Sequence, residues 1–178
     1  MIILLDMDGV LADFETGFVE GWRARFPGVP PLDPSLRRHF NITDDYPPEQ
    51  RSMVVDVYGA EGFFLHLAPV AGAIEGVRAL EAMGHDIRFC SSPLRRYRHC
   101  VGEKYAWIDH YFGLDFVERL ILTRDKTLVR GDVLIDDKPE ITGAVAPAWR
   151  RIVFDQPYNR GVRAPRMTWA NWREVLLD

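Results

Sequence analysis

The chain has 178 residues, 47% of them hydrophobic, and a formal net charge of −4 at pH 7. This size and apolar content allow one domain with a buried core and a small insertion. The net negative charge argues against a broad surface for a nucleic-acid polymer, although a local basic cluster could still bind a small anion.

Two further features bear on the compartment. The only cysteines, Cys90 and Cys100, are expected to be reduced thiols rather than a disulfide. No apolar run approaches the roughly 20 residues needed to cross a bilayer, and no basic leader precedes the first apolar run at Ile2. We therefore expect a cytoplasmic protein with no membrane partner.

Strand and helix patterns alternate along most of the chain. Residues 2–6, IILLD, consist of four consecutive apolar residues followed by Asp6, which is typical of a strand that is covered on both faces. Residues 71–84 carry apolar residues at helical spacing and end at Gly84, which favours a helix. Further strands are expected at 86–92, 117–123, 133–137 and 150–154, and further helices at 97–113 and at 168–178, the latter with Thr168 as N-cap. This order predicts an α/β fold: a three-layer, Rossmann-like parallel sheet with helices on both faces.

Residues 15–69 interrupt the alternation. They contain no clear strand and two pairs of adjacent prolines, and helical spacing appears at 14–26 and 49–59. We expect a small helical cap inserted after the first strand, with 1–14 and 70–178 forming the core. Ligands of open parallel sheets bind beyond the carboxyl ends of the strands, so such a cap would cover the site as a lid.

Four expected strands end in polar residues at what should be one edge of the sheet. The pairs are Asp6 and Asp8, Ser91 and Ser92, Arg124 and Lys126, and Asp136 and Asp137. Taken singly, each has an ordinary alternative: a turn, a helix start, a surface lysine or a solvated loop acid. Their convergence at one edge favours a functional site.

The charges at this edge indicate the chemistry. Three aspartates, Asp6, Asp136 and Asp137, would form an all-oxygen pocket that suits Mg²⁺, whereas no His or Cys pair has zinc-ligand spacing. A magnesium ion with Lys126 and hydroxyl groups nearby would hold a phosphoryl group.

These residues resemble those of the haloacid dehalogenase-like phosphatases, which combine DMDGV, a hydroxyl residue, a lone lysine and DD. Longer stretches resemble the 5′(3′)-deoxyribonucleotidases, from residue 4 to about 139: DMDGVLADFE, RARFP, CSSP, GEKYAW, ERLILTRDKT and LIDDKP. The C-terminal TWANWREVL is a looser match.

The resemblance implies a role for each catalytic candidate. Asp6 would attack phosphorus and form an aspartyl-phosphate. Asp8 would protonate the departing sugar oxygen and then take a proton from the attacking water. Ser91 would hydrogen-bond the phosphoryl oxygens, and Lys126 would offset their charge.

The resemblance also implies a metal site and a substrate site. Magnesium would be held by Asp6, the backbone carbonyl of Asp8, and Asp136, with Asp137 orienting the set. The cap phenylalanines that stack on a nucleobase in the family correspond to Phe14, Phe40 and Phe64, although aromatic residues in a small helical bundle are usually core. Ser92, Arg95 and Arg124 are the remaining substrate candidates, and Arg95 and Arg124 could instead be solvated.

One position departs from the family pattern. The family places an apolar, often large, side chain directly after the phenylalanine that Phe40 matches, where this chain has Asn41. The base preference is therefore left open.

The leading hypothesis is a magnesium-dependent phosphomonoesterase that acts on (deoxy)ribonucleoside 5′- or 3′-monophosphates. The alternatives are a phosphatase for another small phosphate ester, a receiver-like phosphoacceptor, and a non-catalytic nucleotide-binding protein. The expected partner is a small nucleotide. Members of the family are often dimers, so the resemblance also implies a homodimer.

Overall fold

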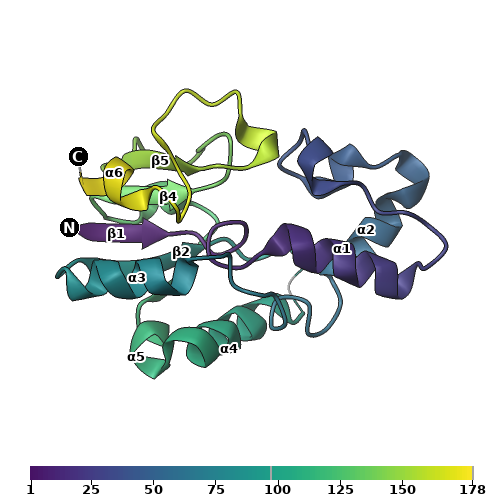
Figure 1. Ribbon diagram of the computed structural model, residues 1–178, viewed down its shortest axis with the longest axis horizontal. Coiled ribbons are helices and arrows are strands. Elements are labelled where there is room, and N and C mark those ends of the chain that lie inside the picture. Colours follow the sequence, from purple (N-terminus) through teal and green to yellow (C-terminus); the bar gives the residue numbers. More distant parts are fainter. Residues whose placement is uncertain (97, 178) are drawn as a thin grey trace.

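The computed structural model describes residues 1–96 and 98–177 and is built on one six-stranded sheet (Figure 1). The strand order is β3-β2-β1-β4-β5-β6, and every neighbouring pair is parallel. The strands are β1 (Ile2–Leu5), β2 (Asp86–Ser91), β3 (Leu120–Leu122), β4 (Val133–Asp136), β5 (Arg150–Phe154) and β6 (Arg166–Met167). The predicted α/β fold with a parallel sheet is confirmed.

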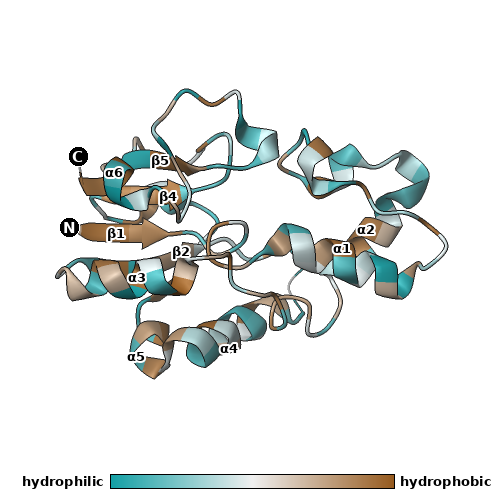
Figure 2. Ribbon diagram, viewed as in Figure 1, coloured by the Kyte–Doolittle hydropathy of each residue, from teal (hydrophilic) through white to brown (hydrophobic). Residues whose placement is uncertain are grey.

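The helices of the core cover mainly one face of this sheet. They are α3 (Ala73–Ala82), α4 (Cys100–Phe112), α5 (Leu114–Val117) and α6 (Trp172–Leu177). Because side chains alternate along a strand, Ile3 and Leu5 of β1 point to the face where these helices contribute Val77, Trp107 and Trp172 to the main core. Figure 2 shows β1 hydrophobic along its length, whereas the helices alternate between hydrophobic and hydrophilic residues.

The opposite face is covered more thinly than expected. Its buried residues Leu4, Cys90 and Leu134 pack with Trp149 from the connection before β5. The connections that follow β3 and β4 carry only the short 3₁₀-helix η4 (Lys126–Leu128) among the described residues. Prolines and a glycine in the β4–β5 connection disfavour a helix there, and no α-helix of the described residues lies in either connection.

Residues 15–69, which we call the cap, lie beyond the carboxyl end of β1 (Figure 1). Their elements are α1 (Phe14–Arg25), η1 (Pro34–Leu36), η2 (Ile42–Asp45), η3 (Pro48–Gln50) and α2 (Arg51–Tyr58). They surround a hydrophobic cluster of their own, centred on Phe18, Trp22 and Tyr46. Helix α1 begins where the Asp13 carboxylate accepts a hydrogen bond from the Thr16 N–H.

The chain enters and leaves the cap side by side. The Asp13 N–H donates to the Ala68 carbonyl, and the Val70 N–H donates to the Leu11 carbonyl, both at 2.8 Å. This paired connection sits directly after the loop that carries Asp6 and Asp8, so the cap is anchored beside the candidate site.

Several predicted boundaries were wrong. The strand expected at 117–123 begins only at Leu120, because Leu114–Val117 form the short helix α5. Thr168 is not an N-cap: its hydroxyl accepts from the Ala170 N–H in a turn, and α6 begins at Trp172. Strand β6 was not expected, since two residues are too few for a periodic signal.

The helix expected at 97–113 begins at Cys100. Two residues of predicted helices lie outside the described residues: Tyr97, the first residue of that helix, and Asp178, the last residue of the helix expected at 168–178. Cys90 and Cys100 are both buried free thiols, as predicted. None of the helices in the described part of the chain has the length and apolar character to cross a membrane.

Candidate active site

A cavity of about 610 Å³ lies between the carboxyl ends of the strands and the cap. This volume is within the usual range for small-molecule sites. Every predicted site residue except Ser91 lines it: Asp6, Asp8, Phe14, Phe40, Phe64, Ser92, Arg95, Arg124, Lys126, Asp136 and Asp137. The structure therefore brings residues that are far apart in the sequence together around one cavity.

Asp6 is fixed by the end of β1. Its N–H donates to the Ile135 carbonyl at 3.0 Å, which continues the pairing with β4, and its Oδ1 accepts from the Met7 N–H at 2.8 Å. Its Oδ2 lies 3.0 Å from Lys126 Nζ. Burial raises the pKa of Asp6, and the charge of Lys126 opposes that rise.

Gly9 turns the chain away from the sheet immediately after Asp8. Its φ of +74° is a conformation that favours glycine. A Cβ at this position would lie 2.5 Å from Asp137 Oδ2 and 3.2 Å from the Tyr158 hydroxyl. Glycine is thus required both for the turn and for the close approach of Asp137, and the turn leaves Asp8 at the cavity wall.

Lys126 stands between two of the acids. Its Nζ lies 2.6 Å from Asp136 Oδ2 as well as 3.0 Å from Asp6 Oδ2, and the residue is buried. Burial lowers the pKa of Lys126, but the charges of Asp136 and Asp6 outweigh it and raise the pKa above its ordinary value. Lys126 is therefore an ammonium cation at neutral pH.

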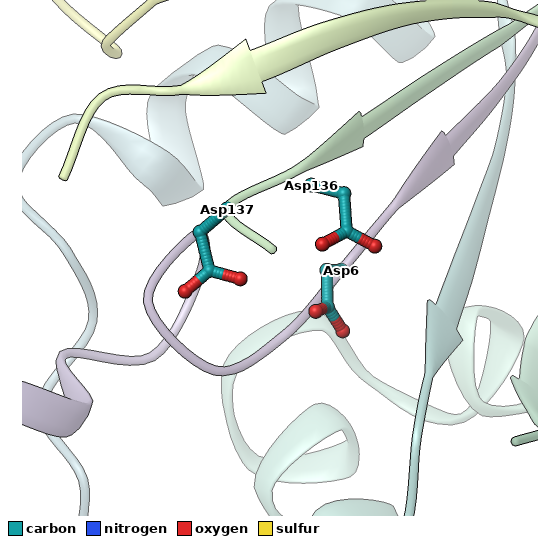
Figure 3. Close-up of side chains that lie close together, drawn as sticks. All are labelled: Asp6, Asp136 and Asp137. Carbon is teal, nitrogen blue, oxygen red and sulfur yellow. The ribbon is translucent and has the colours of Figure 1, made fainter. Parts of the chain in front are cut away.

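The carboxylates of Asp6, Asp136 and Asp137 form an acidic cluster at the ends of β1 and β4 (Figure 3). One oxygen from each lies within 4.8 Å of the others. Both Asp136 oxygens are engaged, Oδ2 by Lys126 Nζ at 2.6 Å and Oδ1 by the Lys138 N–H at 2.8 Å. Asp137 differs, because its Oδ2 accepts from the Tyr158 hydroxyl while its Oδ1 is buried without a hydrogen-bond partner.

An unpartnered buried oxygen is costly unless a cation satisfies it. Burial also raises the pKa of Asp137 well above its ordinary value, and the nearby charges of Asp136 and Asp6 add to this. A cluster of buried carboxylate oxygens with one oxygen free fits a hard divalent cation such as Mg²⁺.

Lys104 is the functional candidate that sequence reasoning missed. It lies on α4 with its side chain 1% exposed, and its Nζ contacts Asp8 Oδ2 at 2.7 Å and Ser91 Oγ at 3.0 Å. Ser91 is itself buried behind the cavity wall. Cys100, Trp107 and Ile108 are buried on the same helix, and their spacing from position 104 places this lysine on the buried face. That spacing was the signal available in the sequence.

The neighbouring Glu103 ties the returning end of the cap to the core. Its Oε1 accepts from the Gly62 N–H at 2.6 Å, and its Oε2 accepts from the Phe64 N–H at 3.0 Å. Phe64 is buried, and its ring centroid lies 5.0 Å from Lys104 Nζ. Adjacent residues of α4 therefore hold an aromatic wall of the cavity and an acid of the site.

The three predicted phenylalanines do not form one group. Phe14 and Phe64 lie together, with ring centroids 6.5 Å apart, and both also pack on the main core. Phe40 is exposed and lies instead against Tyr158, at 5.9 Å between centroids. The cavity thus has an aromatic wall on the core side and a separate aromatic group in the cap.

The basic and polar candidates stand at the rim. Ser92, Arg95 and Arg124 are exposed, and Arg124 Nη1 donates to the Pro93 carbonyl at 3.4 Å. Asn41 also lines the cavity, and its Nδ2 donates to Asp44 Oδ2 at 3.3 Å.

Comparison with known proteins identifies the family. The family model described as "5' nucleotidase, deoxy (Pyrimidine), cytosolic type C protein" matches residues 1–177. A Bordetella pertussis protein is 54% identical over 177 residues, covering 99% of this chain and 95% of that protein. The human "5'(3')-deoxyribonucleotidase, cytosolic type" is 45% identical over 185 residues, covering 98% and 92%.

Solved structures show the same fold at low identity. A haloacid dehalogenase (HAD) family hydrolase from Deinococcus radiodurans, with bound phosphate and sodium, has a TM-score of 0.61 at 19% identity and covers 98% of this chain and 94% of that one. A HAD hydrolase from Bacillus subtilis bound to magnesium has a TM-score of 0.64 at 12% identity, covering 98% and 97%. The fold of this chain is thus the one seen in HAD hydrolases. Both the fold and the sequence relatives agree with the resemblance, and this chain belongs to the 5′(3′)-deoxyribonucleotidase family.

Proposed function

We propose that this protein is a magnesium-dependent phosphomonoesterase that hydrolyses (deoxy)ribonucleoside 5′- or 3′-monophosphates through an aspartyl-phosphate. The observation that carries this proposal is one cavity lined by Asp8, Lys126, the acidic cluster that includes Asp6, and aromatic side chains, with Lys104 in contact with Asp8. Membership of the deoxyribonucleotidase family supports it.

In the first step, a carboxylate oxygen of Asp6 attacks phosphorus and the bond from phosphorus to the sugar oxygen breaks. Asp8 gives its proton to that oxygen, so the alcohol leaves neutral. In the second step, water attacks phosphorus, Asp8 takes its proton, and the Asp6–phosphorus bond breaks to release inorganic phosphate. Lys126, 3.0 Å from Asp6, offsets the charge of the phosphoryl group in both steps.

Lys104 is the natural partner of Asp8 in this scheme. Its contacts to Asp8 at 2.7 Å and Ser91 at 3.0 Å fix the carboxylate against the end of β2. We assign Lys104 as a positioning residue, because it acts on the substrate only through Asp8. The resemblance gave Ser91 a direct contact to phosphate. The buried position of its hydroxyl favours an indirect role for Ser91 instead, as a second contact that holds Lys104.

For the metal, the contacts favour a division of roles other than the one implied by the resemblance. Asp137 has the free buried oxygen, so we assign it with Asp6 and the carbonyl of Asp8 as the magnesium ligands. Asp136 has both oxygens engaged and anchors Lys126. When bound, magnesium would neutralise phosphoryl oxygens and hold them beside Asp6.

This assignment is testable by calorimetry. Asp137→Asn is expected to weaken Mg²⁺ binding more than Asp136→Asn, which should mainly lower turnover. The reverse order would restore Asp136 as the primary ligand.

The substrate would lie across the cavity with its base against aromatic faces. Phe14 and Phe64 provide one wall and Phe40 the other, and each stacked base is worth about 1–3 kcal/mol. Arg95, Arg124 and Ser92 would contact the rest of the nucleotide. The separate hydrophobic cluster of residues 15–69 supports the proposal that they form a cap domain acting as a lid.

The proposal is tested by phosphate release with Mg²⁺ from dUMP, dTMP, UMP, 3′-monophosphates and simple sugar phosphates. Nucleotides are expected to be hydrolysed faster than sugar phosphates, because only they reach the aromatic walls. Asp6→Asn should abolish turnover, and Asp8→Asn should accumulate the phosphorylated enzyme. Stable phosphorylation at Asp6 in the parent protein, with no release from any ester, would instead favour a phosphoacceptor. The cytoplasmic location and the homodimer remain predictions.

A further inference from the structure

Tyr158 connects the acidic cluster of the core to the cap. It lies on η5 (Pro157–Asn159), in the connection between β5 and β6. This connection is held firmly at the site: Asn159 Nδ2 donates to the Asp137 carbonyl at 2.7 Å and to the Phe154 carbonyl at 2.8 Å. Gln156 Nε2 donates to the Gly9 carbonyl at 2.7 Å. Tyr158 is therefore fixed relative to the loops that follow β1 and β4, which carry the aspartates of the site.

The hydroxyl of Tyr158 faces the acidic cluster. It donates to Oδ2 of Asp137, while Oδ1 of the same carboxylate is buried without a partner. A hydrogen bond to one oxygen fixes the rotation of the carboxylate group and so determines where the other oxygen points. In Figure 3 the Asp137 carboxylate lies beside those of Asp6 and Asp136. The tyrosine hydroxyl thus determines which Asp137 oxygen is available to a cation.

The ring of Tyr158 faces the cap. Its centroid lies 4.8 Å from the guanidinium carbon of Arg37 and 5.9 Å from the ring centroid of Phe40, at an interplanar angle of 71°. These are favourable cation–π and edge-to-face geometries. The ring is therefore in contact with the segment of the cap that lines the cavity.

Arg37 makes this contact consequential, because it organises that segment. It is 4% exposed, and its guanidinium donates to the carboxylates of Glu15 and Asp45 and to the carbonyl oxygens of His39 and Phe40. A displacement of Arg37 would move the backbone on both sides of Phe40.

We propose that Tyr158 is a two-ended positioning residue: its hydroxyl orients Asp137 for cation binding, and its ring sets the position of the Arg37–Phe40 segment over the cavity. The hydroxyl half rests on the proposed function, since it presumes that the acidic cluster binds a divalent cation. The ring half rests on the proposed function as well, since it presumes that the cavity binds a nucleotide. No sequence motif pointed to Tyr158, which lies between LIDDKP and the looser match TWANWREVL.

Two substitutions separate the halves. Tyr158→Phe keeps the ring and removes the hydroxyl, whereas Tyr158→Leu removes both. The readouts are the dissociation constant for Mg²⁺ alone, measured by calorimetry without substrate, and KM and kcat for dUMP at saturating Mg²⁺. Tyr105→Phe is the matched control, because Tyr105 is exposed on α4.

Tyr158→Phe is expected to weaken Mg²⁺ binding about 10-fold, as loss of an outer-shell hydrogen bond typically does, with KM for dUMP close to that of the parent. Tyr158→Leu should show the same loss of Mg²⁺ affinity and, in addition, a KM about 3- to 10-fold higher. Amide hydrogen exchange over residues 38–46 should be faster in Tyr158→Leu than in Tyr158→Phe. If Tyr158→Leu does not fold, Tyr158→Met replaces it in both measurements.

The outcomes distinguish this inference from the function on which it rests. A parent protein that binds no Mg²⁺ and releases no phosphate would overturn the proposed function. A parent that does both, with unchanged Mg²⁺ affinity in Tyr158→Phe, would overturn the role of the hydroxyl alone. Equal KM and equal exchange in the Phe and Leu variants would overturn the role of the ring.

Discussion

Glu103→Gln tests whether α4 holds the returning end of the cap. The substitution preserves the shape of the side chain, and the parent carboxylate accepts one backbone N–H on each oxygen, from Gly62 at 2.6 Å and from Phe64 at 3.0 Å. A glutamine amide offers one acceptor and one donor group. One of the two N–H groups would therefore face an NH₂ group and lose its hydrogen bond.

The cost follows from the burial of this contact. A hydrogen bond to a charged group is worth about 1.5–3 kcal/mol, and Glu103 is 8% exposed, so water replaces the lost partner poorly. For a chain of this length each kcal/mol corresponds to roughly 2–4 °C in melting temperature. We expect Glu103→Gln to lower the melting temperature by roughly 3–12 °C and to raise KM, because Phe64 becomes less well positioned.

The measurement is differential scanning calorimetry of Glu103→Gln beside Glu118→Gln, whose carboxylate is exposed. The control should melt with the parent. A melting temperature for Glu103→Gln within about 1 °C of the parent would refute the reasoning, since it would mean that the lost hydrogen bond to a buried carboxylate contributes almost nothing.

Three further predictions concern other parts of the site. Gly9→Ala should weaken Mg²⁺ binding and cost about 1–2 kcal/mol in stability, because the new Cβ would lie 2.5 Å from Asp137 Oδ2 at a φ of +74°; Gly28→Ala, with no atom within 4 Å, is the control for calorimetry and melting. Lys104→Met should lower kcat at least about 10-fold because Asp8 loses its partner, and Lys104→Arg should recover part of the lost kcat. An unchanged kcat with a changed KM would argue against this role. Burial raises the pKa of Cys90 from 9.0 to about 12, so iodoacetamide at pH 8 should not modify Cys90 until the protein is unfolded, and mass spectrometry showing rapid labelling of the native protein would contradict this. Because the unfolded thiol ionises first, this group should also reduce stability as the pH rises above 9.0.

Local pattern was sufficient for the core of the fold. The apolar residues of IILLD and the later apolar runs predicted strands, since a strand buried on both faces carries apolar side chains on both. Polar strand ends then predicted a site, because carboxyl ends of parallel strands meet at one edge. The cavity lined by Asp6, Lys126 and Asp136 agrees with that expectation.

Element boundaries were less accessible. The short helix α5 and the start of α6 depend on short segments whose conformation is decided by packing. In α5, for example, Phe116 packs against Phe89 in the core. A four-residue helix and a two-residue strand carry too little periodicity to be distinguished from loops.

The contacts across the site were decided only by the tertiary structure. Lys104 and Asp8 are 96 positions apart, and Tyr158 and Asp137 are 21 apart on different elements, yet each pair is hydrogen-bonded. A sequence specifies which faces are buried, because periodicity is local, but the partner of a buried polar group depends on where distant elements meet. For that reason the residues proposed to act on the substrate were visible in the sequence, whereas those proposed to hold them in place appeared only in the fold.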